Sequence, residues 1–106
     1  MIVTTTNEIP GKRIVETVGL VRGSTVRARH LGKDLGSFIT NIVGGEMVEY
    51  TKLLAESREQ ALDRMRDEAR SKGANAIVAI RFSGSEISLG AAEVLVYGTA
   101  VVIEEV

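Results

Sequence analysis

The sequence contains no cysteine, and only 4% of its residues are aromatic. The lack of cysteine excludes disulfides, iron–sulfur clusters, thiolate zinc sites and cysteine nucleophiles. The scarcity of aromatic side chains leaves few groups that could stack on a base or a flavin. We therefore expect a core of Val, Ile, Leu, Ala and Met, and no cofactor.

An excess of charge of either sign is also missing. Thirteen basic and fourteen acidic side chains give a net charge of −1, whereas a nucleic-acid-binding domain usually shows a basic excess. No apolar stretch approaches the roughly 20 residues needed to span a bilayer. The first residues lack the charged start and apolar region of a signal peptide. These absences predict a cytoplasmic protein with neither nucleic-acid nor membrane partners.

What is present is an ordinary globular composition. The 106 residues are 44% hydrophobic and 25% charged, a balance that supports a folded core. This length falls in the size range of one domain. No linker, internal repeat or low-complexity tract divides the chain, so the sequence predicts a single domain over residues 1–106.

The strongest pattern predicts a long amphipathic helix from Glu46 to Lys72. Gly73 follows it in the position where glycine often ends a helix with positive φ. About 27 residues would make a rod of roughly 40 Å, too long for a monomer whose radius of gyration should be near 13 Å. We therefore expect part of the apolar stripe to pack on a second chain. The stripe consists of Met47, Tyr50, Leu54, Ala61, Leu62, Met65 and Ala69.

β-Branched and apolar runs predict four strands. They lie at Ile2–Thr6, Arg13–Arg29, Ala76–Phe82 and Val94–Ile103, and a polar connection from Ser83 to Ala92 separates the last two. The second and fourth strands carry apolar residues on both faces, which is typical of strands covered by a helix and by a neighbouring subunit. The predicted fold class is α+β, with one helix layer on a mostly antiparallel sheet.

Three glycines interrupt the predicted strands. Gly19 and Gly23 predict a bulge or a turn in the second strand, and Gly98 predicts a bulge or a close backbone approach in the last. Between His30 and Gly45 the pattern is weaker. There Asp34 is placed to cap a short helix from Leu35 to Val43.

Two segments could bind an anion. Gly44-Gly45-Glu46 opens the long helix, and helix N-termini bind anions, although a Gly-Gly hinge explains the same residues. Arg27 and Arg29 share a strand face and could grip a carboxylate or phosphate. The alternative for these arginines is pairing with acidic residues such as Asp34 or across a subunit contact.

No residue pattern predicts catalysis. His30 is the only histidine; it could form a metal or general-base pair with Asp34, or lie on the surface beside the basic strand. No serine has the surroundings of a nucleophile. The acidic ridge of the helix (Glu56, Glu59, Asp63 and Asp67) is typical of a solvated face.

A combination of residues spread over nearly the whole chain is typical of one family. It consists of Thr4-Thr5, Gly11, Val15-Glu16, Val18, Gly23, Asp34, Val43-Gly44-Gly45-Glu46, Tyr50, Leu54, Arg58, Gly73-Ala74-Asn75-Ala76-Ile77-Val78 and Gly98-Thr99-Ala100-Val101. In these residues the chain resembles the YbjQ-like family, a group of uncharacterised bacterial and archaeal proteins. The resemblance implies a dodecin-like subunit with a β-α-β-β core that assembles into a ring-shaped pentamer.

The same resemblance carries the label "putative heavy-metal-binding". Soft metals favour thiolates, thioethers and imidazoles, and here such ligands are limited to His30, Met1, Met47 and Met65. The two helical methionines lie on the apolar stripe, where methionine usually fills a core. We assign no metal ligands. The sequence thus predicts a non-enzymatic homo-oligomer that binds an unidentified small ligand or partner at its subunit interfaces, with heavy-metal binding as the alternative.

Overall fold

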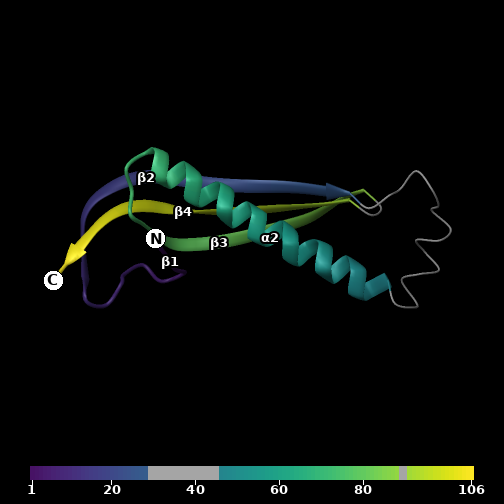
Figure 1. The fold of residues 1–106 in the computed structure, drawn as a ribbon, viewed down its shortest axis with the longest axis horizontal. Helices are drawn as coiled ribbons and strands as arrows, with labels where there is room; N and C mark the ends of the chain where they lie inside the picture. Colours follow the sequence, from purple (N-terminus) through teal and green to yellow (C-terminus); the bar gives the residue numbers. More distant parts are fainter. Residues whose placement is uncertain (29–45, 89–90) are drawn as a thin grey trace.

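The structure is a computed structural model that describes residues 1–28, 46–88 and 91–106. One helix lies against a four-stranded sheet whose strand order is β1-β3-β4-β2 (Figure 1). This arrangement confirms the α+β class and the β-α-β-β core, formed here by β2, α2, β3 and β4. The elements are β1 (Ile2–Val3), β2 (Lys12–Ala28), α2 (Glu46–Ser71), β3 (Ala76–Ser88) and β4 (Ala91–Glu105).

The sheet is mixed but mostly antiparallel. β4 lies between β2 and β3 and pairs with both in antiparallel orientation, whereas β1 pairs with β3 in parallel. The polar connection predicted over residues 83–92 is wrong, because β3 continues to Ser88 and β4 begins at Ala91. Ser83 and Gly84 have low strand propensity, but they form ladder pairs with Leu95 and Val94. Pairing with an apolar partner strand therefore overrides their local preference.

The N-terminal strand is also shorter than predicted, since β1 ends at Val3. The chain still follows β3 beyond that point. The Thr4 N–H donates to the Ile77 carbonyl (3.0 Å), and the Thr4 carbonyl accepts from the Ile80 N–H (3.1 Å). A third bond joins the Ala79 N–H to the Thr6 carbonyl (2.8 Å). The N-terminal segment therefore occupies this part of the outer edge of β3.

Two of the three predicted glycine irregularities are confirmed. Gly19 has a φ of +135° at a register shift between β2 and β4. At Gly98 a Cβ would lie 2.8 Å from the Ile80 Cγ2 and 2.9 Å from the Ile77 Cγ2, so this is a close approach. The bulge itself lies on the neighbouring strand, where the register shifts between Val78 and Arg81.

The bulge or turn predicted at Gly23 is wrong. It lies in a regular part of β2, where a Cβ would be 2.1 Å from the Ala61 carbonyl oxygen and 2.6 Å from the Met65 nitrogen. The backbone of α2 therefore lies directly on Gly23. The sequence pattern could not show this, because the approach is between segments about 40 residues apart in the chain.

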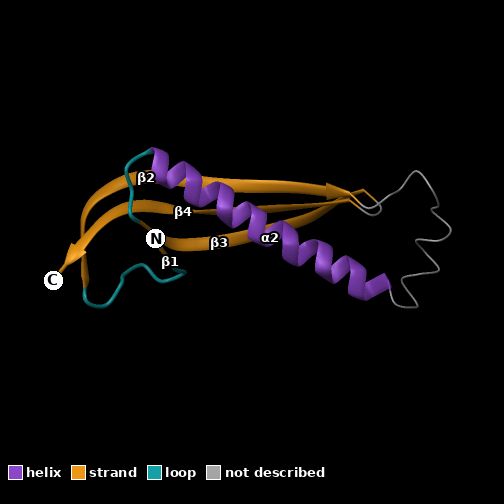
Figure 2. Ribbon diagram, viewed as in Figure 1, coloured by secondary structure: helices purple, strands orange, loops and turns teal. Residues whose placement is uncertain are grey.

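The main core lies between α2 and one face of the sheet (Figure 2). Ala61, Met65 and Ala69 of the predicted stripe are fully buried, and Leu54 and Leu62 are partly buried against them. The sheet contributes Val21, Ile77, Ile80, Val94, Val96 and Ala100. The stripe of α2 is thus confirmed where its side chains are described.

The end of α2 and the start of β3 are held by specific hydrogen bonds. Gly73 has a φ of +86°, and the N–H groups of Gly73 and Ala74 donate to the carbonyls of Arg70 and Ala69 (both 3.0 Å). This pair of bonds is a Schellman motif. It confirms the prediction that Gly73 ends the helix with a positive φ. Next, the Asn75 side chain accepts from the Ile103 N–H (2.7 Å) and donates to the Ile103 carbonyl (3.0 Å). Asn75 therefore extends the β3–β4 ladder by one residue.

Candidate functional site: the open face of the sheet

The two faces of β2 differ sharply in their exposure. Val21, Gly23 and Thr25 are buried under α2, whereas the alternating residues point to the opposite face. On that opposite face Leu20 is 64% exposed and Val26 is 60% exposed. We call it the open face. It comprises Leu20, Arg22, Ser24 and Val26 of β2, Leu95, Tyr97 and Thr99 of β4, and Arg81 and Ser83 of β3.

Strand register brings three polar side chains into one row across the open face. Arg22 on β2 lies opposite Tyr97 on β4, and Tyr97 lies opposite Arg81 on β3. Directly paired residues of an antiparallel sheet project from the same face. We call these three residues the arginine–tyrosine row. The next row consists of Ser24, Leu95 and Ser83, so hydroxyl groups flank the apolar Leu95.

The two guanidinium groups of this row have no described carboxylate partner. The Arg81 Nη1 donates to the carbonyls of Thr5 (3.0 Å) and Ile80 (2.7 Å), which fixes the side chain without neutralising its charge. Among the side chains that the structure describes, none pairs with the Arg22 guanidinium. Both positive charges are therefore available to a bound anion.

Side chains of α2 reach over the outer edge of β2 beside this row. The Glu68 carboxylate accepts from the Arg22 backbone N–H (2.9 Å), and the Arg64 Nη1 donates to the Ser24 carbonyl (2.6 Å). Unpaired N–H and C=O groups at a sheet edge invite another strand to pair there. Here Glu68 and Arg64 satisfy those groups, so edge pairing is blocked at this part of β2 and the open face is left for contacts.

The far end of the same sheet face is covered by the chain itself. Ile9, in the loop that precedes β2, packs on a small second core formed by Ala76, Val78 and Val101. The open face therefore begins where this loop cover stops, and the exposed residues belong to the middle of the sheet.

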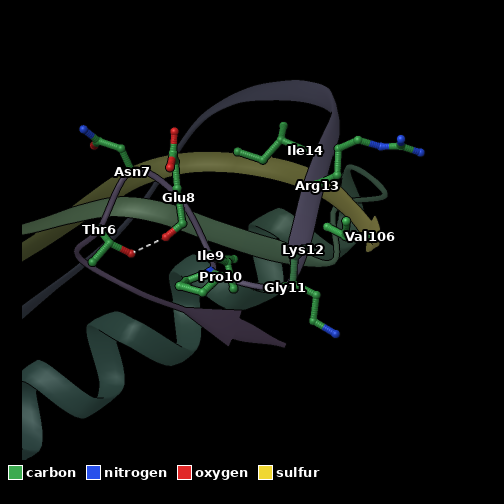
Figure 3. Close-up of a pocket in the computed structure, with 10 residues that line it drawn as sticks. All are labelled: Thr6, Asn7, Glu8, Ile9, Pro10, Gly11, Lys12, Arg13, Ile14 and Val106. Atoms are coloured by element: carbon green, nitrogen blue, oxygen red, sulfur yellow. Dashed lines mark hydrogen bonds between the residues drawn. The ribbon is translucent and has the colours of Figure 1, made fainter.

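A hollow of about 1000 Å³ lies between that loop and the beginning of β2 (Figure 3). Its two cationic side chains are already paired, Lys12 with Glu105 and Arg13 with Glu104 (3.3 Å). Apolar groups such as Ile9 and Ile14 line much of the remainder. This hollow offers a bound anion less than the arginine–tyrosine row does, because its cations are neutralised.

Most of the predicted site residues lie outside the described part of the chain. Arg27 belongs to β2, opposite Ala92, whereas Arg29, His30, Gly44 and Gly45 fall within residues 29–45. The short helix predicted after Asp34 lies in the same segment. The anion and metal interpretations of these residues therefore remain predictions.

Sequence reasoning predicted none of the three residues of the arginine–tyrosine row as a site. Arg22 lies on the same strand as the predicted Arg27, but nothing near it in the sequence points to Tyr97 or Arg81. The information lies in the register of two strand pairs. A bulge on β3 shifts that register by one residue, so no count along the sequence could align the three side chains.

In residues 1–28, 46–88 and 91–106 no group of three or more His, Cys, Asp or Glu side chains is arranged to hold a metal ion. None of the helical residues described forms a segment long and apolar enough to cross a bilayer.

The fold and the open face define a small α+β protein without a recognisable catalytic site among its described residues. A family model described as "Putative heavy-metal-binding" matches residues 1–104. UPF0145 proteins are similar over almost their whole length. One from Clostridioides difficile is 50% identical over 105 residues, covering 99% of this chain and 94% of the relative. One from Methanosarcina acetivorans is 52% identical over 103 residues, covering 97% of each. The chain belongs to this family, the YbjQ family, and the predicted resemblance is confirmed.

A solved structure supports the fold alone. A protein of unknown function that belongs to the DUF74 family, from Pediococcus pentosaceus, matches with a TM-score of 0.71 and 14% identity, covering 98% of each chain. None of the names of these relatives indicates an enzymatic activity.

Proposed function

We propose that the protein is a non-enzymatic homo-oligomer that binds a small ligand or partner at its subunit interfaces. One observation carries this proposal: Leu20 and Val26 are 64% and 60% exposed on the same sheet face. Burying one such side chain completely contributes about 1.5–3 kcal/mol. A second copy that covers the open face would bury both.

The shape of the chain supports the same proposal. Its radius of gyration is 17.4 Å, whereas a compact chain of this length would have about 13 Å. An elongated subunit buries less of its own apolar surface and leaves more for contacts between copies. The pentameric ring implied by the family resemblance is the assembly we propose.

Paired substitutions on the open face test this assembly. Leu20→Ser with Val26→Ser should raise the dissociation constant of the oligomer at least about tenfold, since two apolar contacts are lost. Val106→Ser removes an aliphatic group that is 89% exposed at the end of the chain, and it should leave association unchanged. Sedimentation velocity over a range of protein concentrations gives both values. Equal effects of the two changes would contradict the proposal.

Heavy-metal binding is the second candidate, and the description of the matching family favours it. It predicts stoichiometric metal after native purification, measured by elemental analysis, and loss of that metal on His30→Ala. Metal-free protein whose thermal unfolding does not shift when Zn²⁺ or Cu²⁺ is added would contradict it. The cytoplasmic location and the absence of nucleic-acid and membrane partners remain predictions from the sequence.

A further inference from the structure

The arginine–tyrosine row places two arginines on the strands either side of Tyr97, and neither guanidinium group forms an ion pair with a side chain that the structure describes. Adjacent strands of a sheet are about 5 Å apart, so Arg22 and Arg81 each lie one strand away from Tyr97. A ring stacked on Tyr97 would therefore bring a charged substituent over one arginine or the other.

The two positive charges of this row favour an anionic ligand. Arg81 uses Nη1 to hold two backbone carbonyls, and its Nε and Nη2 donors make no hydrogen bond within the part of the chain that the structure describes. The Glu68 carboxylate lies at the edge of β2 beside this row, where it accepts from the Arg22 backbone N–H (2.9 Å). On the sheet face itself, strand register places the nearest described acidic residue, Glu93, four residues along β4 from Tyr97, or about 13 Å away. Guanidinium groups bind carboxylates and phosphates through paired hydrogen bonds.

Tyr97 provides the apolar part of the same surface. Tyr97 is 39% exposed although it lies in a central strand. Leu95 lies two residues away on the same face, and Leu20 lies in the row on the other side. Aromatic side chains stack on flat rings whatever the ring's hydrogen-bonding pattern. The surface thus combines an aromatic ring, Tyr97, on which a ligand ring can stack, with two positively charged side chains, Arg22 and Arg81.

We propose that the arginine–tyrosine row binds a small molecule in which a flat aromatic ring carries a phosphate or carboxylate group. This inference deepens the proposed function, because it names the ligand class, and it rests on that proposal for the location at a subunit interface. Leu20 and Val26 lie on either side of the row along β2. A second copy packed on these two residues would cover the arginine–tyrosine row and exclude water from the bound anion. Excluding water strengthens the electrostatic attraction between the anion and the arginines.

The natively assembled full chain is titrated with two probes, one that carries a phosphate group and one that carries a carboxylate group, so that binding of the two groups can be distinguished. Adenosine 5′-monophosphate carries a phosphate and 2-naphthoate carries a carboxylate; adenosine and 2-naphthamide are their uncharged counterparts. Calorimetry should give a dissociation constant for at least one charged probe that is about tenfold or more below that of its counterpart. Inorganic phosphate alone should bind more weakly than the nucleotide, because it cannot stack.

Variants assign this binding to the row. Arg22→Gln with Arg81→Gln, and separately Tyr97→Leu, should each weaken binding of the charged probe about tenfold or more. Tyr97→Phe keeps the ring and should bind almost as the wild type does. The matched control is Arg58→Gln, which removes an exposed positive charge from α2 instead of from the open face.

Two results would overturn the site. One is equal weakening by Arg58→Gln and by the double arginine change, which would show only general charge attraction. The other is no binding of either charged probe at about 5 mM, far weaker than a specific small-ligand site. Sedimentation velocity of the same samples shows whether the proposed ligand site or the proposed assembly is wrong. An intact oligomer that binds neither probe overturns the site alone, whereas a monomeric wild type overturns the assembly.

Discussion

The two faces of β2 differ in what covers them. On one face Val21 and Thr25 are buried beneath α2, and Gly23 lets the helix backbone approach the strand. On the other face Leu20 and Val26 remain mostly exposed, with Arg22 between them. Both faces are apolar enough to be covered, but the described part of the chain supplies a helix for only one. Two apolar faces on one strand therefore indicate that something covers each face, but they do not show whether it is another part of the chain or a second copy.

The largest expected loss of stability comes from a substitution in the core between α2 and the sheet. Met65 is fully buried between α2 and the sheet, and Met65→Ala should lower the free energy of unfolding by about 4 kcal/mol, because it removes apolar contacts and leaves a cavity. Urea unfolding followed by circular dichroism gives this value. Protein concentration must be held constant, since association shifts the apparent stability.

The matched change on the open face is Leu20→Ala. Leu20 is 64% exposed, so in the dissociated chain this change should alter the free energy of unfolding by less than about 0.5 kcal/mol. The same urea titration at low protein concentration measures it. A loss as large as that of Met65→Ala would mean that the chain covers Leu20 itself, and the contrast between the faces would fail.

The close helix approach gives the second prediction. Gly23→Ala places a Cβ against backbone atoms of Ala61 and Met65, which cannot move aside as a side chain can. The change should cost about 3 kcal/mol of unfolding free energy. Gly84→Ala is the control, because the only neighbour of its added Cβ is a carbonyl oxygen 3.6 Å away. A neutral Gly23→Ala would contradict the packing of α2 on β2.

The edge contact between the two faces gives a smaller loss of stability than either change in the covered face. Glu68→Ala removes the acceptor of the Arg22 N–H and should cost about 1 kcal/mol, since the bond is charge-assisted but partly exposed to water. Glu68→Gln keeps an acceptor and should cost less than half of that. Hydrogen exchange of the Arg22 amide should accelerate in Glu68→Ala and much less in Glu68→Gln. Equal exchange in all three proteins would contradict the contact.

Much of the fold could be predicted where its causes are local. The helix begins at Glu46 as predicted and ends within one residue of the predicted Lys72, because its stripe and Gly73 are both written in the nearby sequence. The extension of β3 to Ser88 could not be predicted in this way. Its Ser and Gly residues favour a turn locally and become a strand only through pairing with β4.

The candidate site shows the same limit more strongly. Arg22, Tyr97 and Arg81 come from three strands and become neighbours only through two ladder registers, one of which contains a bulge. Basic clustering along the sequence pointed instead to Arg27, Arg29 and His30. Contiguous charge is visible in a sequence, whereas charge assembled across strands requires the structure.

Native mass spectrometry of the wild-type protein tests the central claim most directly, because it reports the subunit count and any retained ligand together. At micromolar concentration we predict the mass of an oligomer of two or more 11.4-kDa subunits, with five as the proposed number, plus the mass of any retained ligand. A single species of 11.4 kDa under the same conditions would contradict the claim that the open face of the sheet is covered by another copy.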